Sequence, residues 1–193
     1  INDAPILEFI SEQNVDEDAT FSFSIIATDV DGDALDYEVS IDGNADVFLD
    51  DNDLTIIPFA NFNGEISVAV TITDGSLIDS QSFILNVLPV NDPPVIGAIS
   101  NQQVDEDGSL EVPLYASDID EDVLIFTADG DVNSSVSVVD NVVTIIPTAN
   151  YNGSLTITAH VSDGEYSDST TFTLTVNSVN DAPVVINTID DIE

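Results

Sequence analysis

The chain has 193 residues, of which 38 are Asp or Glu and none is Lys or Arg, so its formal net charge is −38 at pH 7. This charge excludes nucleic acids and anionic membrane surfaces as partners, because both are bound through basic side chains. Hydrophobic residues make up 43% of the chain and are spread along it, which predicts a folded protein. No apolar run approaches the roughly 18 residues of a membrane-spanning helix. The natural partner of such a surface is a cation.

A repeat with a step of 89 residues organises the sequence. Asn2 and Asp3 begin a motif that returns at 91–94 and at 180–183, and about 40% of the aligned positions are identical without any insertion. The repeat predicts two tandem domains, 1–90 and 91–179, with 180–193 as the start of a third. Because the pattern begins and stops within a repeat, we expect the chain to be part of a longer array.

Alternation of apolar and polar residues predicts half-buried strands throughout the first copy. In chain order, the alternating or short apolar runs lie at 6–10, 21–27, 35–41, 47–49, 54–57, 66–72 and 83–87. The second copy repeats the plan, with runs at 110–114, 124–126, 143–145, 155–161 and 172–176. Asp-Gly and Asn-Gly pairs between many of the runs favour turns. About seven short strands per copy predict an all-β, immunoglobulin-like sandwich.

Acidic residues gather between the predicted strands, where the loops at the two ends of a sandwich lie. The clusters are Asp16-Glu17-Asp18, the triplet Asp29, Asp31 and Asp33, the single Asp74, and Asn91-Asp92, with counterparts at 105–107, at 118, 120 and 122, and at 163. Calcium takes six to eight oxygen ligands, mostly from carboxylates and carbonyls. Each Asp alone could simply be a solvated turn residue. The whole set recurs in register in a chain without basic residues, and this favours calcium.

Two known calcium-binding loops do not fit the sequence. An EF-hand that begins at Asp29 requires Gly at its sixth place and Glu at its twelfth, where the chain has Ala34 and Ser40. The Gly-rich nonapeptide of calcium-binding β-rolls does not occur. The predicted site therefore belongs to neither class.

Several motifs resemble the cadherin repeat. They are Val90-Asn91-Asp92-Pro93-Pro94, Glu17, the segment 116–120 and Val161-Ser162-Asp163-Gly164. The segment 58–64, followed by a strand that ends at Thr73-Asp74-Gly75, is similar to bacterial cadherin-like and Ig-like repeats. Those repeats occur in tandem in large secreted adhesins and surface enzymes. The resemblance covers essentially the whole chain and implies two tandem seven-stranded immunoglobulin/cadherin-like Greek-key β-sandwiches.

Cadherins hold calcium between successive domains, and the resemblance implies the same for the matching positions here. One site would use Glu17, Asn91, Asp92, Asp118, Asp120 and Asp163. Half a site, completed by a preceding repeat, would use Asn2, Asp3, Asp29, Asp31 and Asp74. A second half-site, completed by a following repeat, would use Glu106, Asn180 and Asp181.

Two departures from the cadherin pattern lower the expected number of ions. The cadherin Asp-Arg-Glu element is replaced by the segment 61–65, and Pro89 and Ser178 stand where an acidic residue would precede the joint. We therefore expect one or two Ca²⁺ per joint. His160, the single histidine, alternates with apolar neighbours and is expected to face solvent.

The sequence predicts a non-catalytic, calcium-binding structural or adhesion module of a long extracellular bacterial protein, located at the cell surface. Its expected partners are the neighbouring repeats of the same chain, and cell-surface proteins or glycans are further possibilities. Membrane insertion is not expected. The alternative is a carbohydrate-binding accessory module of a secreted enzyme. Carbohydrate-binding modules usually present a planar row of aromatic residues, and the sequence shows no such row. Binding to a glycan array would favour the alternative.

Overall fold

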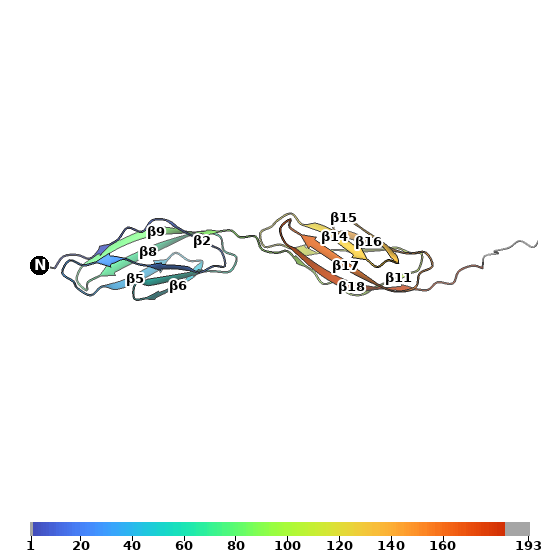
Figure 1. Ribbon diagram of the computed structural model, residues 1–193, viewed down its shortest axis with the longest axis horizontal. Helices are drawn as coiled ribbons and strands as arrows, with labels where there is room; N and C mark the ends of the chain where they lie inside the picture. The colour runs from blue at the N-terminus through green and yellow to red at the C-terminus, as the bar shows by residue number, and fades with distance from the viewer. Residues whose placement is uncertain (1, 184–193) are drawn as a thin grey trace, which may run out of the picture. The chain divides into compact units, whose positions relative to one another are not determined.

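The computed structural model of the chain describes residues 2–183. The chain divides into two compact units, Ile1–Val90 and Asn91–Glu193, and each unit is a β-sandwich with the same succession of strands (Figure 1). Of the predicted third repeat, residues 180–183 form no strand and 184–193 lie outside the described residues. Among the residues that the structure describes, no helix is long and apolar enough to cross a membrane.

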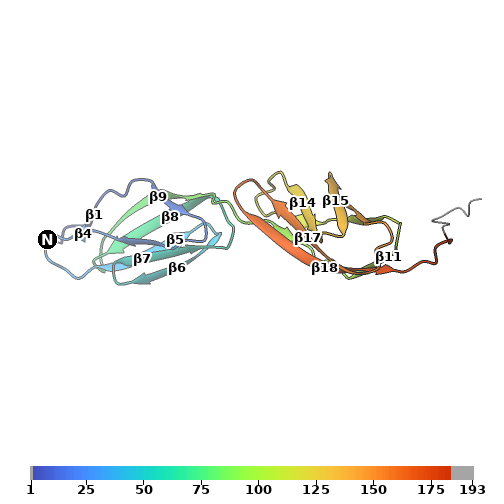
Figure 2. The same ribbon diagram turned by 45° about the vertical axis from the view of Figure 1, so that its right-hand side comes forward.

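Nine strands form the first unit. They are β1 (Ile6–Leu7), β2 (Gln13–Asp16), β3 (Phe21–Ser24), β4 (Ala27–Thr28), β5 (Asp36–Ile41), β6 (Ala45–Asp50), β7 (Asp53–Pro58), β8 (Gly64–Thr73) and β9 (Ile78–Leu88). Seven of them build the two main sheets, in the orders β2-β9-β8-β5 and β3-β7-β6. The seven-stranded sandwich is thereby confirmed. The short strands β1 and β4 pair with each other as a further ladder (Figure 2).

The two main sheets enclose one hydrophobic core. Four alternating residues of β8, namely Ile66, Val68, Val70 and Ile72, are completely buried, because successive side chains of a strand point to opposite faces. Burial of each such side chain contributes about 1.5–3 kcal/mol. The rings of Phe21, Phe23 and Phe83 lie 6.2–6.4 Å apart, centre to centre; Phe21 and Phe83 belong to this core, and Phe23 packs against it.

The second unit repeats the first, strand by strand. Its strands are β10 (Val95–Ile96), β11 (Gln102–Asp105), β12 (Leu110–Pro113), β13 (Ala116–Ser117), β14 (Ile125–Gly130), β15 (Ser134–Val139), β16 (Val142–Pro147), β17 (Gly153–Ser162) and β18 (Ser167–Asn177). The main sheets have the orders β11-β18-β17-β14 and β12-β16-β15. Its core is separate from that of the first unit and centres on β17, where Leu155, Ile157, Ala159 and Val161 are buried.

The predicted single strand at 21–27 is two strands in the structure. Ile25 and Ile26 separate β3, which pairs with β7, from β4, which pairs with β1. The break is stabilised by Asn52, whose side-chain amide donates to the Ile25 carbonyl at 2.9 Å, while the Ile25 N–H donates to the Asn52 carbonyl at 2.8 Å. The alternation continues through the break, and the sequence therefore gave no sign of it.

Candidate metal centre

Six polar residues gather at the end of the first unit where its chain begins. Asp29 follows β4, and its Oδ1 accepts hydrogen bonds from the backbone N–H groups of Asp31 (2.8 Å) and Asp33 (3.3 Å). This turn holds the three carboxylates on one side of a single loop. Their oxygens lie within 4.8 Å of one another.

The other members of the group come from distant parts of the chain. The Asp31 carboxylate accepts from the Asp3 N–H at 2.7 Å, and the Asn2 side-chain amide donates to Asp74 Oδ2 at 2.8 Å. Asp74 lies in the turn between β8 and β9, where its Oδ1 accepts from Ser76 and Leu77. We call Asn2, Asp3, Asp29, Asp31, Asp33 and Asp74 acidic cluster A.

The second unit contains the same arrangement, which we call acidic cluster B. It consists of Asn91, Asp92, Asp118, Asp120, Asp122 and Asp163. Asn91 donates to Asp163 Oδ2 at 2.9 Å, and the Asp92 N–H donates to Asp120 Oδ2 at 2.7 Å. The carboxylate oxygens of Asp118, Asp120 and Asp122 lie within 4.8 Å of one another.

Each cluster contains a buried oxygen that no protein hydrogen bond satisfies. Asp29 Oδ2 in cluster A and Asp118 Oδ2 in cluster B are shielded from solvent and have no hydrogen-bond partner among the described residues. A buried carboxylate oxygen without a partner is costly. A cation would satisfy it, and the chain offers no Lys or Arg for this purpose. The donor set therefore fits a metal ion.

Hydrogen bonds lower the pKa of two carboxylates of the clusters. The pKa of Asp74 lies below its usual value of 3.8, because the Leu77 backbone N–H, the Asn2 side chain and the Ser76 N–H stabilise the anion. Burial raises the pKa of Asp163, but the hydrogen bonds from Asn91, Glu165 and Tyr166 together lower it below the same usual value. Both side chains are therefore anionic at neutral pH.

Glu17, which the cadherin resemblance assigned to the same site as the residues of cluster B, lies at the end of the first unit opposite cluster A. It follows β2 at the opposite end of β9, where its N–H donates to the Leu88 carbonyl at 2.9 Å. The side chain is only 4% exposed, and Oε1 accepts from the Val90 N–H at 2.7 Å while Oε2 accepts from Asn63 at 3.4 Å. Glu17 therefore fastens the end of the last strand of its unit.

Glu106 has the same place in the second unit. It is 7% exposed and accepts from the Val179 N–H at 2.6 Å and from the Asn152 side chain at 3.4 Å. Asn180 and Asp181 follow directly, and the Asn180 amide donates to the Asp181 carbonyl at 3.4 Å. The same contact links Asn91 to Asp92 in cluster B. The metal-binding role of Glu17, Glu106, Asn180 and Asp181 stays a prediction from the family resemblance.

Asp33 and Asp122 were part of the acidic triplets predicted from the sequence, but the cadherin pattern assigned them no place in a site. The structure brings them together with the other two carboxylates of each triplet. The Asp-x-Asp-x-Asp spacing places three carboxylates in one tight loop. His160 lies on β17 and is partly exposed, with Nε2 3.2 Å from Asp129 Oδ2, as a solvent-facing strand residue should be.

The fold and the two polar clusters define a pair of tandem Ig-like β-sandwich domains with acidic ends. The sequence profile of the bacterial Ig domain matches residues 2–86 and again residues 91–177, and the chain belongs to this family. Domains of this kind are typically non-catalytic, and tandem copies are typical of structural modules in extracellular proteins. A comparison with curated proteins gave no match.

Solved structures of similar fold come from several proteins. The human protocadherin-24 EC1-2 fragment (form II) has a TM-score of 0.59 at 15% identity, with 94% of this chain and 100% of that chain covered. An endo-fucoidan hydrolase of glycoside hydrolase family 107 has a TM-score of 0.38 at 18% identity, with 91% of this chain and 29% of the hydrolase covered. The titin domains Z1Z2 in complex with telethonin have a TM-score of 0.38 at 18% identity, with 93% and 100% covered. At these identities the likeness concerns the fold alone.

Proposed function

We propose that the chain is a calcium-binding structural module of a long extracellular bacterial protein, and that each acidic cluster binds Ca²⁺. The observation that carries the proposal is the buried, unsatisfied Oδ2 of Asp29, which lies within a group of carboxylates and has the same counterpart at Asp118. Among the described residues, these two carboxylate oxygens lack what a bound cation would supply.

The geometry suits calcium. Ca²⁺ binds oxygen at 2.3–2.6 Å, so that two ligands of one ion lie at most about 5 Å apart. The carboxylate oxygens of each triplet satisfy this limit at 4.8 Å. Asn and Asp side chains supply the hard oxygen ligands that calcium prefers, and each cluster contains one Asn in addition to its Asp residues.

Calcium would stiffen the point at which the chain enters each unit. Asn91 and Asp92 belong to the segment that joins the two units and already contact Asp163 and Asp120. An ion held by these residues would fix the segment to the second unit. Without the ion, the carboxylates of the cluster repel one another and weaken the same attachment. In an array of such repeats, calcium would thereby limit bending at each joint and support a spacer or adhesion role.

The test is thermal unfolding in calcium and in chelator, with NaCl added to match the ionic strength. Extracellular calcium modules bind at about 10⁻⁴–10⁻³ M, and a tenfold excess over the dissociation constant stabilises the unit by about 1.4 kcal/mol. The melting temperature should rise by about 6–11 °C, because each kcal/mol raises it by about 4–8 °C in a domain of this size. Superimposable curves would refute the proposal.

Matched variants assign the ions to the clusters. Asp29→Asn and Asp118→Asn keep the Oδ1 acceptor of the turn but remove a charge, and each should abolish the calcium response of its own unit. Asp46→Asn is the control, because Asp46 is an exposed residue of β6 outside both clusters. Calorimetric titration with Ca²⁺ gives the number of ions, for which one per cluster is the minimum expected.

A further inference from the structure

The three-stranded sheets end in strands that pair on one side only, and β14 lies alongside the start of β15. Their orders are β3-β7-β6 and β12-β16-β15, so that β3, β6, β12 and β15 each pair with a single strand among the described residues. An open edge presents unpaired N–H and C=O groups that can pair with another chain, and proteins commonly block such edges with charged residues or proline. The two units block different edges.

The first comparison is between β3 and its counterpart β12. Glu111 and Pro113 stand in β12 at the positions of Ser22 and Ser24 in β3. Pro113 lies within the β12–β16 ladder, opposite Val142, although it has no N–H. The N–H at this position is therefore not needed for the ladder, and in β3 the Ser24 N–H is directed to the open edge. In β12, Pro113 lacks this N–H donor and Glu111 carries a negative charge. The matching serines of β3 provide neither of these two features.

The second comparison is between β6 and its counterpart β15, and here the first unit has the charged edge. In β6 of the first unit, Asp46 and Asp50 are exposed, whereas the matching positions in β15 are Ser135 and Val139. The strand β15 reads Ser-Ser-Val-Ser-Val-Val and carries no charge. Each unit thus has one edge with charged residues and one edge without, and the edge without charge differs between the units.

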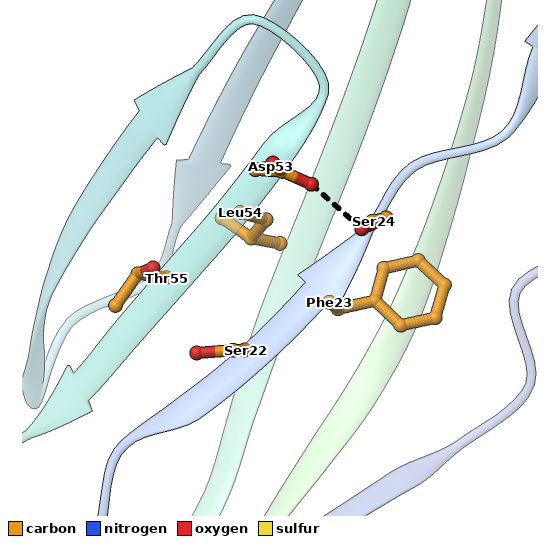
Figure 3. Close-up of a pocket in the computed structure, with 6 residues that line it drawn as sticks. All are labelled: Ser22, Phe23, Ser24, Asp53, Leu54 and Thr55. Carbon is orange, nitrogen blue, oxygen red and sulfur yellow. Dashed lines mark hydrogen bonds between the residues drawn. The ribbon is translucent and has the colours of Figure 1, made fainter.

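Exposed apolar side chains flank both uncharged edges. Beside β3, a hollow of about 160 Å³ is lined by Phe23, Phe9, Ile26, Glu8 and Ile10, and Phe9 is 80% exposed. Figure 3 shows the adjoining hollow over β3 and β7, where Phe23 points away from β7 and Ser24 is hydrogen-bonded to Asp53. Beside β15, Val132 is 92% and Val139 is 70% exposed. Such side chains favour a contact that removes them from water.

We propose that β3 of one copy pairs with β15 of a second copy, so that the two three-stranded sheets join edge to edge. A basic partner would favour the acidic edges, such as β5 with Asp36 and Glu38, rather than the two edges that lack charge. A copy of this chain, with its charge of −38, associates best through an edge where no carboxylate faces another.

The residues of the two strands suit each other. Polar Ser22 and Ser24 can lie beside the serines of β15, while Phe21 and Phe23 can lie beside its valines. Aromatic and β-branched side chains form favourable cross-strand pairs. Because β3 and β15 are different, a copy that binds through its β3 still has its own β15 available for a further copy. This contact is heterologous and can continue from copy to copy.

The test is sedimentation equilibrium of the 193-residue chain in chelator and 0.5 M NaCl, where the acidic clusters hold no calcium and surface charges are screened. The mass should increase with protein concentration. Two variants transfer the charged edge of one unit to the other: Ser22→Glu/Ser24→Pro in β3, and Ser135→Asp/Val139→Asp in β15. Each should weaken self-association about tenfold or more.

Mixing the two variants decides the pairing. The β3 variant keeps an intact β15 and the β15 variant keeps an intact β3, so an equimolar mixture should form a dimer that cannot grow further. A monomeric wild type at millimolar concentration would overturn the proposal. Self-association that survives in either variant, or a mixture that stays monomeric, would overturn the pairing of β3 with β15. Circular dichroism checks folding, and Ser22→Glu/Ser24→Lys replaces the proline variant if that variant does not fold.

Discussion

The acidic clusters are alike in the two units, whereas the sheet edges differ. Asn2 binds Asp74 as Asn91 binds Asp163, and the distances, 2.8 and 2.9 Å, are nearly the same. At the edges, however, Ser24 is replaced by Pro113 and Asp50 by Val139. The contrast shows that the polar groups of the clusters leave little freedom for substitution. At the edge, in contrast, the hydrogen-bonded pair of Ser24 and Asp53 is replaced as a whole by Pro113 and Val142.

The largest effect is expected at Glu17, the buried carboxylate that the two units also share. Glu17→Ala removes the acceptor of the Val90 N–H and should destabilise the first unit by about 2–3 kcal/mol in chelator, because hydrogen bonds to charged groups are strong and their buried donors are left unsatisfied. Glu106→Ala should do the same in the second unit. Hydrogen exchange monitored by mass spectrometry measures the stability of each unit separately.

The control for this prediction is Glu65→Ala, because Glu65 is exposed and its counterpart in the second unit is Ser154. The control should change stability by less than about 0.5 kcal/mol. If Glu17→Ala lowers the stability of the first unit only when calcium is present, the carboxylate acts by binding the metal and not through its hydrogen bond with the Val90 N–H.

An intermediate effect is expected at the break between β3 and β4. Asn52→Ala and Asn141→Ala remove a side-chain donor from the carbonyls of Ile25 and Leu114 at 2.9 and 3.0 Å. Each should cost about 1–2 kcal/mol, because the carbonyl is left partly buried without that partner. Urea unfolding measures the loss, and the exposed Gln103→Ala is the control. Unequal losses in the two units would show that the break is less alike than its geometry indicates.

The smallest effect concerns protonation of the clusters. The pKa values of Asp74 and Asp163 are lowered from 3.8 in the folded chain, so their contribution to stability is complete above about pH 3.8 and is lost as the pH falls through the lowered values. In calcium-free solution, Asn2→Ala should raise the pKa of Asp74, and Asn91→Ala should raise that of Asp163. Carboxyl NMR titration measures both. A shift in one unit only would contradict the equivalence of the clusters.

The sequence predicted the strands that alternate over many residues. The long strands β8 and β9 were identified because four inward residues of β8 and three of β9 repeat with period two. In contrast, β2 was missed, since Gln-Asn-Val-Asp has a single apolar residue, and its pairing with β9 joins residues that are 72 apart in the chain. The strand β15 was missed because serines and valines give little contrast between its two faces.

The candidate site was predictable only where its contacts are local. Asp29, Asp31 and Asp33 share one loop, and their spacing alone brings them together. The contact of Asn2 with Asp74 spans 72 residues and was anticipated only through the resemblance to cadherin repeats. The burial of Glu17 could not be read from the sequence, because a carboxylate in an acidic loop looks the same whether it is solvated or enclosed.

The parallel pairing of β2 with β9 determines how each sandwich resists mechanical load. Gln13 lies opposite Leu85 and Asp16 opposite Leu88, so the short strand β2 near the start of the unit and its last strand β9 run in the same direction. The chain enters near β1 and leaves after β9 at the far end of this ladder (Figure 1). Tension between the two ends therefore drags β2 and β9 past each other and strains all rungs of the ladder together. A repeat built in this way yields by shear, at a higher force than one whose rungs open one after another.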